Sequence, residues 1–336
     1  MIVLKKIIYY ILTIIVLLLI LAFFMSRDIT ASVSRESKIP ANYLYNLANN
    51  MSAMKLWNPW VIEDTSLVLK YTDKNEGVGA GYSWDSKDGK GSVMTTKVVV
   101  NELIEVEMDM GDDDEKAHYQ QRFKTEGGRT SMTWDFQAKM SWPFNVASPV
   151  MKYMMKKYFN KGMKNMEEIC LNRVENSTYR SFKIDEVQQG EFHFITSRNE
   201  VNFSQMDEFY AQNLAIIYKK IQDAGLTAVG NPCGLYYKWD AANNRTDMAV
   251  GVPVTEAKEI SELATASIPA RSAYVIHYYG DRSKTENAHQ AMDEYFKDHN
   301  LLSDVPVIEE YASDPLVEKD PNKWLTNIIY YATAKN

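Results

Sequence analysis

An uninterrupted apolar block opens the chain, from residue 7 to residue 25. In a helix that rises about 1.5 Å per residue, a block of this length spans a hydrocarbon layer of roughly 30 Å. Lys5 and Lys6 precede it, which favours a cytoplasmic amino terminus, although basic residues beyond the block weaken this bias. A cleaved signal peptide is the alternative, but its apolar region would be shorter and followed by small residues. We therefore expect a single-pass membrane anchor over residues 1–26, with the rest of the chain outside the cytosol.

Residues 27–176 change from a helical period to a period of two. Apolar positions in residues 39–54 recur at helical spacing, and Pro59 ends that helix. In residues 103–111 and 131–140, apolar and polar residues then alternate, which is typical of half-buried antiparallel strands. Short turns rich in glycine and polar residues separate these strands, so the pattern predicts a meander of hairpins.

A long amphipathic helix closes this unit over residues 148–174. Met155, Phe159 and Met166 lie near one face, and lysines occupy other positions. A Met-rich stripe is most often plain core, but over a curved sheet it can also line an adaptable apolar cavity. Gly162, in the interior, weakens the helix by about 1 kcal/mol relative to alanine.

The order of these elements resembles the helix-grip fold of the polyketide cyclase, START and SRPBCC superfamily. The resemblance rests on "WNPW" with Trp57 and Trp60, on the strand at residues 79–81, and on the strand end at Trp84. It implies a hydrophobic cavity between the sheet and the long helix that holds a lipid, a polyketide or another apolar ligand. The side chains expected to line this cavity are Trp84, Trp134, Met155 and Phe159.

From about residue 178 onward, the order strand, helix, strand, strand occurs twice. The first copy consists of "GEFHFITS", "SQMDEFYAQNLAIIYKKIQDAG", "LYYKWD" and "DMAVGVPV". The second consists of "ARSAYVIHYYG", "SKTENAHQAMDEYFKDHN", "PVIEEYASDP" and "WLTNIIYYA". In the second helix, Ser283 and Glu286 form a predicted capping box. A duplicated unit of this kind brings the strands of both copies into a shared sheet or groove.

This half resembles the GyrI-like family, also called the bacterial transcription activator effector-binding domain, in the order and spacing of these segments. In that family, two repeats enclose a groove lined by aromatic side chains and at least one carboxylate. The groove binds bulky, often cationic or aromatic, small molecules, and some members hydrolyse reactive natural products. The family's Glu-x-Tyr element falls on Glu309 and Tyr311, and its aromatic strand falls on Tyr236 and Tyr237. Asn327 departs from the family, which often has an acidic residue at this position.

The predicted ligand site lies in this groove. Because adjacent residues of a strand point to opposite faces, Glu309 and Tyr311 share one face and Glu310 lies on the other. The resemblance assigns the first face to the groove, so Glu309 is expected to be sheltered and Glu310 solvated. A cation stacked on aromatic rings beside Glu309 would gain about 0.5–2 kcal/mol. The alternative is that Glu309 only bonds a backbone amide or a tyrosine hydroxyl and holds the groove together. The expected ligand-binding residues are Glu309, Tyr311, Tyr236, Tyr237, Tyr279, His277 and Trp324.

Composition narrows the classes of function. The chain has 336 residues, including 21 Tyr, 12 Phe and 7 Trp, and this aromatic surplus suggests partly wet cavities as well as core. A net charge of -7 provides no basic footprint for nucleic acid, and no helix-turn-helix precedes the second half, so regulation of transcription is disfavoured. No metal-ligand spacing, phosphate-binding loop or nucleophile elbow occurs, and three aspartates at positions 112–114 predict a solvated turn. We expect no cofactor and no metal.

Two classes of function remain. The first is a membrane-anchored small-molecule-binding protein with an apolar cavity in the first half and an aromatic, acidic groove in the second. The second is a hydrolase of a reactive small molecule, with Glu309 as acid or base and a tyrosine assisting. His277 stands beside Tyr278 and Tyr279 where a base could act, although a hydrogen-bonded strand histidine is the favoured interpretation.

The fold class and the domain division follow from these patterns. We expect an α+β chain in which a helix-grip domain over residues 27–176 precedes a duplicated effector-binding domain over residues 177–336. Cys170 and Cys233 match no metal or redox spacing, and the sequence leaves open whether they form a disulfide or stay buried thiols.

Overall fold

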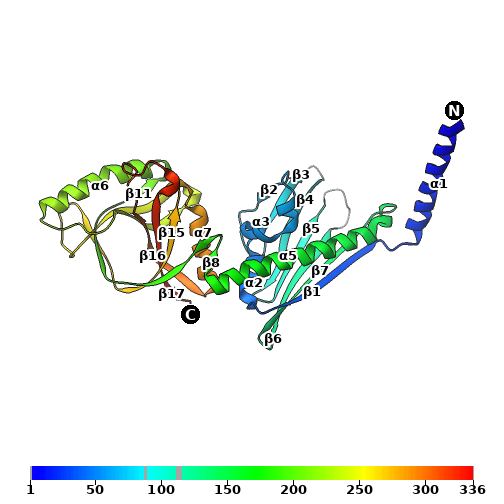
Figure 1. Ribbon diagram of the computed structural model, residues 1–336, viewed down its shortest axis with the longest axis horizontal. Coiled ribbons are helices and arrows are strands. Elements are labelled where there is room, and N and C mark those ends of the chain that lie inside the picture. Colours follow the sequence, from blue (N-terminus) through cyan, green and yellow to red (C-terminus); the bar gives the residue numbers. More distant parts are fainter. Residues whose placement is uncertain (1, 87–88, 111–115, 336) are drawn as a thin grey trace. The chain divides into compact units, whose positions relative to one another are not determined.

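The computed structural model describes residues 2–86, 89–110 and 116–335 (Figure 1). The chain combines helices with curled antiparallel sheets and one apolar amino-terminal helix. It divides into two compact units, Met1–Leu171 and Asn172–Asn336. The three aspartates at positions 112–114, predicted to form a solvated turn, lie outside the described residues.

The apolar block at the amino terminus forms α1, Ile2–Phe24. By length and composition, its segment Leu4–Phe24 could cross a membrane. Most side chains of this segment are exposed, for example 57% for Ile14 and 59% for Leu17. A helix with an apolar surface that protein does not cover is suited to a lipid environment.

Within the described residues, seven strands form the antiparallel sheet of the first unit, in the order β1-β7-β6-β5-β4-β3-β2. The alternating segments predicted at residues 103–111 and 131–140 are confirmed as β5 and β7. β1 pairs with β7, with Asp28 opposite Lys139, so the first strand lies beside the last. The strands are β1 (Asp28–Ser37), β2 (Val68–Tyr71), β3 (Gly81–Ser86), β4 (Gly89–Val99), β5 (Leu103–Asp109), β6 (Ala117–Glu126) and β7 (Arg129–Lys139).

Short helices connect β1 to β2, and a long helix follows β7. A helix break occurs at Asn58, next to Pro59, but the helix predicted over residues 39–54 already ends at Asn49. The Asn58 side chain accepts a hydrogen bond from the Trp60 backbone N–H and caps the next helix, in which Pro59 takes the first position. The helices are α2 (Ala41–Asn49), η1 (Met51–Ala53), α3 (Met54–Trp57), α4 (Pro59–Glu63), η2 (Phe144–Ala147) and α5 (Ser148–Asn176).

Helix α5 lies across the strands of the first sheet and buries its Met-rich stripe there (Figure 1). Met163 and Met166 are 0% exposed and Phe159 is 2% exposed. The Phe159 ring meets Trp134 of β7 edge-on, with ring centroids 5.6 Å apart. A Cβ atom at Gly162 would lie 2.9 Å from the Trp134 ring, so this glycine allows the helix to approach the sheet closely.

In the second unit, the described residues form an eight-stranded antiparallel sheet in the order β10-β15-β17-β16-β12-β13-β11-β14, and a separate β8-β9 hairpin. The predicted order strand, helix, strand, strand occurs as β11-α6-β12-β13 and as β15-α7-β16-β17. β12 pairs with β16, so strands of both segments share one sheet, as predicted. The short strands β8, β9, β10 and β14 were not predicted.

The predicted elements of this unit are found near their expected positions, although β16 begins five residues and ends four residues before the predicted segment at residues 306–315. The strands are β8 (Thr178–Tyr179), β9 (Phe182–Lys183), β10 (Asp185–Gln189), β11 (Phe192–Asn202), β12 (Cys233–Asp240), β13 (Arg245–Val254), β14 (Ala264–Ile268), β15 (Arg271–Tyr279), β16 (Leu301–Tyr311) and β17 (Leu325–Ala334). The helices are η3 (Phe203–Gln205), α6 (Met206–Asp223), η4 (Ala241–Asn243), η5 (Arg282–Lys284), α7 (Glu286–Asp298) and η6 (Pro321–Lys323).

The two faces of β15, β16 and β17 carry different cores. On one face, Ile276, Ile328 and Tyr330 pack against Met292 and Phe296 of α7. On the other face, the buried residues are Ala273, Val275, Ile308, Ile329 and Tyr331. This division decides which side chains can meet α7.

The predicted capping box at the start of α7 is wrong. The helix begins at Glu286 with Thr285 as its N-cap residue and no side-chain capping bond. Asp281 instead accepts hydrogen bonds from the backbone N–H and the hydroxyl of Ser283, each at 2.9 Å. Asp281 thus takes the Ser283 backbone N–H that Glu286 would accept in a capping box, because Asp readily bonds the backbone two residues onward.

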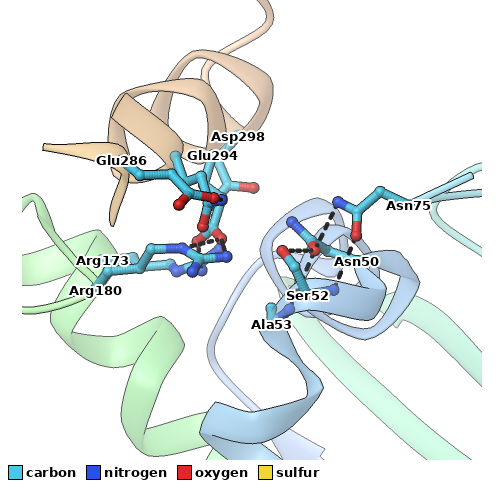
Figure 2. A network of polar contacts seen from close by, with 10 residues as sticks. Asn50, Ser52, Ala53, Asn75, Arg173, Arg180, Glu286, Glu294 and Asp298 are labelled. Carbon is cyan, nitrogen blue, oxygen red and sulfur yellow. Dashed lines mark hydrogen bonds and ion pairs between the residues drawn. The ribbon is translucent and has the colours of Figure 1, made fainter. Parts of the chain in front are cut away.

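A buried ionic cluster fixes the start of the second unit against α7 (Figure 2). Arg173 is 2% exposed and pairs with Glu294 and with Asp298, the latter at 3.2 Å. Arg180 pairs with the other oxygen of Glu294 at 2.7 Å. Removal of one member of such a buried cluster leaves uncompensated charge and typically costs 3–5 kcal/mol.

Candidate functional site

The carboxylate of Glu309 lies near the end of β16 and is sheltered from solvent. Its residue is 7% exposed, which confirms the expectation that it is the buried member of the acidic pair. Its backbone faces Gly234 of β12 and Ile328 of β17. A Cβ atom at position 234 would lie 3.0 Å from the hydroxyls of Tyr236 and Tyr311, so the glycine leaves the space that these hydroxyls occupy.

Two tyrosine hydroxyls meet one oxygen of this carboxylate. The Tyr311 hydroxyl donates to Oε2 of Glu309 at 3.0 Å, and the Tyr236 hydroxyl lies 3.4 Å from the same oxygen. The two hydroxyls are 3.1 Å apart. Burial is the largest cause that raises the pKa of Tyr236 and of Tyr311 well above the ordinary value of 10.0. Both phenols are therefore neutral donors at physiological pH.

An imidazole from α7 meets the other oxygen. Nε2 of His289 lies 2.9 Å from Oε1 of Glu309, and Nδ1 lies 2.8 Å from the Tyr330 hydroxyl. With Glu309 ionised, Nε2–H donates to the carboxylate, and in the neutral ring Nδ1 accepts the proton of Tyr330. We refer to Glu309, Tyr236, Tyr311, His289 and Tyr330 as the Glu309 cluster.

Aromatic and cationic side chains surround the Glu309 cluster. The Tyr210 ring from α6 meets the Tyr311 ring edge-on, with centroids 5.1 Å apart. The guanidinium carbon of Arg282 lies 4.4 Å from the centroid of the Tyr311 ring and 5.6 Å from that of Trp324. The Arg282 guanidinium also donates to the Ser313 carbonyl. The rings of Tyr311 and Trp324 therefore hold a planar cation within the protein itself.

Some buried polar atoms near this site are left without a hydrogen bond. In the part of the chain that the structure describes, neither the Tyr210 hydroxyl nor Nε of Arg282 has a partner. The same is true of the hydroxyl of Thr326, which faces Tyr311 across the β16-β17 pair and is 0% exposed. Because a buried unpaired donor costs about 1–3 kcal/mol, a molecule that bonded these atoms would gain free energy.

Asp293 lies one helical turn after His289 on α7. Burial, the largest cause, raises the pKa of its carboxyl, and the nearby His289 opposes the shift. Although Asp293 is exposed to solvent on one side, the protein atoms around its carboxyl disfavour the charged form. A carboxyl with a raised pKa beside a histidine and a buried glutamate is a feature of functional sites.

Three of the predicted ligand-binding residues lie on the opposite face of the sheet. His277 pairs across β17 with Asn327, and its Nδ1 is 2.7 Å from the Asn327 side-chain oxygen. Tyr237 lies beneath Arg198, whose guanidinium carbon is 3.5 Å from its ring centroid, and Tyr279 is 64% exposed. The register of the strands, which the sequence does not provide, therefore separates His277, Tyr237 and Tyr279 from Glu309.

Glu310 is not the solvated residue that alternation alone suggested. It is half-buried, and its two oxygens accept hydrogen bonds from the side-chain amides of Asn231 at 2.9 Å and Asn327 at 2.7 Å. Asn327 occupies a position where the GyrI-like family often has an acidic residue. Its side-chain amide donates a hydrogen bond to Glu310, on the face opposite Glu309.

The structure brings Glu309, Tyr311 and Tyr236 together, with Trp324 connected through Arg282. His289, Tyr330 and Tyr210 were missed from the sequence. His289 is one of five scattered histidines in the chain, and nothing in its local sequence shows which strand its helix covers.

The four residues predicted to line an apolar cavity in the first unit lie in or beside its core. Trp134, Met155 and Phe159 are 1%, 8% and 2% exposed, and Trp84 of β3 lies beside Tyr82. An open cavity of about 440 Å³ in this unit is lined mostly by polar and charged side chains and by none of these four. The apolar cavity therefore stays a prediction. In the described ranges, no group of three or more His, Cys, Asp or Glu side chains is arranged to hold a metal ion.

Comparison with known proteins gives no family assignment. No family model and no curated protein matches the sequence. Among solved structures, the chain resembles the C-terminal domain of EcmrR at 19% identity, with a TM-score of 0.41 and coverage of 46% of this chain and 98% of that one. An EcmrR–DNA complex shares 16% identity, with a TM-score of 0.42 and coverage of 58% and 73%. A hydrolase from Listeria innocua shares 13% identity, with a TM-score of 0.36 and coverage of 48% and 98%. Likenesses at this level carry no argument about function, which has to be derived from the site.

Proposed function

We propose that this chain is a membrane-anchored protein that binds a bulky aromatic or cationic small molecule at the Glu309 cluster. The observation that carries the proposal is the sheltered carboxylate of Glu309, whose described partners are two neutral phenols and one imidazole. Aromatic rings surround it, and the buried hydroxyl of Tyr210 beside them lacks a partner among the described residues.

Charge and ring chemistry favour a cationic aromatic ligand. A ligand cation about 5 Å from the carboxylate would gain roughly 3 kcal/mol at an effective dielectric constant near 20. Stacking on a tyrosine or tryptophan ring would add about 0.5–2 kcal/mol. The guanidinium of Arg282 on Tyr311 and Trp324 supports this choice, because the same two rings already accept a planar cation. A ligand that stacks on these rings would take the place of Arg282.

The proposal includes the finer architecture expected from the sequence. For residues 177–336 it is a duplicated effector-binding domain, supported by the repeated order β11-α6-β12-β13 and β15-α7-β16-β17. For residues 27–176 it is a helix-grip domain, supported by the burial of the α5 stripe. We locate the ligand in the second of these domains, because Trp134, Met155 and Phe159 of the first pack within its core.

The membrane anchor is the helix α1. Its length and apolar composition support a single crossing, and Lys5 and Lys6 support a cytoplasmic amino terminus. In this topology, the ligand site faces the non-cytosolic side of the membrane. The protein would then bind its ligand before that molecule enters the cytosol.

A hydrolase is the second candidate, and the hydrogen bond between His289 and Glu309 favours it. A carboxylate in contact with an imidazole can accept a proton from water, and the neutral hydroxyls of Tyr236 and Tyr311 can donate to a developing oxyanion. The carboxylate would act as the general base. Slow consumption of a bound electrophile that stops in the Glu309→Gln variant would indicate this activity.

Binding is tested with two ligands of the same shape and different charge. N-methylacridinium is a permanent cation, and acridine is neutral near pH 8. For the full-length protein in lipid nanodiscs, Glu309→Gln is expected to weaken N-methylacridinium binding by about 10- to 100-fold, which is about 1.4–2.7 kcal/mol. Acridine binding should change little.

Glu310→Gln is the matched control, because it removes a charge from the adjacent residue on the opposite face. It should leave the affinity for both ligands unchanged. If Glu309→Gln binds N-methylacridinium as tightly as the parent chain, Glu309 is not the charge partner and the proposal is wrong.

A further inference from the structure

The corner between β7 and α5, residues 140–153, exposes an unusual number of large apolar side chains. The exposed fractions are 52% for Trp142, 72% for Phe144, 61% for Val150 and 69% for Tyr153. These residues are close in sequence and lie within the short helix η2 or a few residues from it. Contiguous exposed apolar groups mark a surface that meets another apolar partner.

This corner is attached to the end of α1. Asn145 of η2 is 0% exposed, and its side-chain nitrogen donates to the carbonyl of Ala22 at 2.7 Å and to that of Met25 at 2.9 Å. The last carbonyls of a helix have no partner within the helix, so this amide supplies one. A protein hydrogen bond to these carbonyls stabilises the helix end most where water is scarce, as it is at the boundary of a bilayer.

The same corner meets α1 well before the helix ends. Between the corner and α1 lies an apolar cavity of about 320 Å³, and residues of both line it. They are Ile15, Leu18, Leu19, Met140, Pro143, Phe144, Val146 and Ala147. Leu19 precedes Phe24 by five residues, which is about 7–8 Å along a helix. If the end of α1 lies at the boundary of the hydrocarbon layer, η2 lies several ångströms inside that boundary.

We propose that residues 140–153 are a second membrane contact, which inserts Trp142, Phe144 and Val150 into the lipid interface beside α1. The inference rests on the proposed role of α1 as the membrane anchor. The partner is a phospholipid bilayer, and the apolar space between η2 and α1 is filled by acyl chains. A monotopic segment of this kind buries its apolar side about 5–10 Å into the boundary of headgroups and chains.

The neighbouring residues fit a lipid partner better than a protein partner. Tryptophan and tyrosine favour the interfacial layer, where an apolar ring and a polar tip are both accommodated. Lys152 and Lys156 follow on α5 and are exposed, as is Arg27 just beyond α1. Basic side chains at this level attract the phosphates of anionic lipids. The surface is also continuous with the exposed apolar side of α1.

Two attachments would orient the first unit on the membrane. With α1 alone in the bilayer, only the hydrogen bonds of Asn145 and the short connection at residues 25–27 would hold the unit at the membrane surface. With the corner inserted as well, the unit presents a fixed side to the bilayer.

The test uses fluorescent labels and lipids with brominated acyl chains, which quench only labels at chain depth. A bimane label is attached to the full-length protein at Phe144→Cys, at Leu18→Cys and at Val100→Cys, and each variant is reconstituted in vesicles. Val100, in the turn between β4 and β5, is 69% exposed and serves as the matched control. The parent chain, whose two cysteines are buried, measures background labelling.

The labels at Leu18 and at Phe144 should each lose about half or more of their fluorescence in brominated vesicles, because both lie at the depth of the acyl chains. The label at Val100 should not change. Trp142→Cys provides a second position in the corner and should behave as Phe144→Cys does.

The possible failures are distinct. If the Leu18 label is quenched and both corner labels behave as the Val100 label does, the corner does not enter the membrane, while the anchor stands. If none of the labels is quenched, α1 is not in the bilayer, and the proposed anchor fails together with the inference. If the corner labels are shielded from bromine and also from aqueous iodide, the surface binds protein, and the lipid assignment is wrong.

Discussion

Gly234→Ala perturbs the Glu309 cluster without removing any of its charges or hydrogen-bonding groups. The added methyl group would lie 3.0 Å from the hydroxyl oxygens of Tyr236 and Tyr311, which is closer than ordinary contacts allow. Both hydroxyls then have to move by a few tenths of an ångström, while their bonds to Glu309 span 3.4 Å and 3.0 Å. The substitution therefore tests whether the arrangement itself matters.

The magnitude follows from two terms. Overpacking of a well-filled site costs about 1–3 kcal/mol, and each weakened hydrogen bond adds up to about 0.5–1.5 kcal/mol. We expect a loss of about 2–3 kcal/mol, which corresponds to a fall in the unfolding temperature of roughly 4–12 °C for a unit of this size. Binding of N-methylacridinium should weaken in parallel.

The assay is thermal and urea unfolding of the full chain, followed by ligand titration. Gly190→Ala is the control, because a Cβ atom there would meet nothing within 4 Å. It should change stability by no more than about 1 kcal/mol. If Gly234→Ala is as stable as Gly190→Ala and binds ligand normally, the packing of the two hydroxyls against Glu309 is not what the geometry indicates.

Two further predictions concern charge in the second unit. Arg173→Met should cost about 3–5 kcal/mol in urea unfolding, because it removes a buried cation that pairs with both Glu294 and Asp298. Lys183→Met, in an exposed pair, should cost less than about 1 kcal/mol, and equal costs would refute the burial argument. Because the pKa of Asp293 is raised in the folded state, that state binds the carboxyl proton more tightly than the unfolded state does. The protonated carboxyl therefore stabilises the fold below the ordinary pKa of 3.8, and this stabilisation is lost as pH rises through the folded pKa. Asp293→Asn should therefore be more stable than the parent chain at pH 7, and the difference should vanish in acid; a difference that grew on acidification would contradict the shift.

Local periodicity explains why much of the fold could be predicted. Alternation at residues 103–111 and 131–140 reflects a sheet with one buried face, and the stripe through Phe159 reflects a helix packed on that face. Such patterns can be seen in the sequence because each residue is apolar or polar according to whether its own position is buried or exposed. The short strand β14, in which small residues predominate, was missed.

The candidate site was predicted only in part, because it depends on register. The alternation of faces correctly predicted that Glu309 is buried. It could not show that His277 pairs with Asn327 and therefore shares a face with Glu310. His289 reaches Glu309 from a helix, and which strands that helix covers is a property of the assembled sheet. The histidine named from the sequence, His277, therefore lies on the face opposite Glu309, and His289, which contacts Glu309, was missed.

Some residues had a visible role in the sequence and a different one in the structure. Gly162 reads as a weak point of a helix, yet it is the position where Trp134 approaches α5. The sequence pattern predicts that Ser283 caps a helix, yet its hydroxyl and backbone N–H both donate to Asp281 and the helix begins at Glu286. In both cases a partner that was not considered from the local pattern decides the outcome.

The central claim is that the ligand binds on the Glu309 face of the second sheet, and photo-crosslinking tests this most directly. An azido derivative of N-methylacridinium would be bound to the full-length protein, irradiated and mapped by peptide mass spectrometry, with excess unmodified ligand as the competitor. We predict competable adducts on Tyr210, Tyr311 and Trp324, whose rings surround the cluster. Competable adducts on Tyr237 or Tyr279 of the opposite face, or in the first unit, would contradict the account.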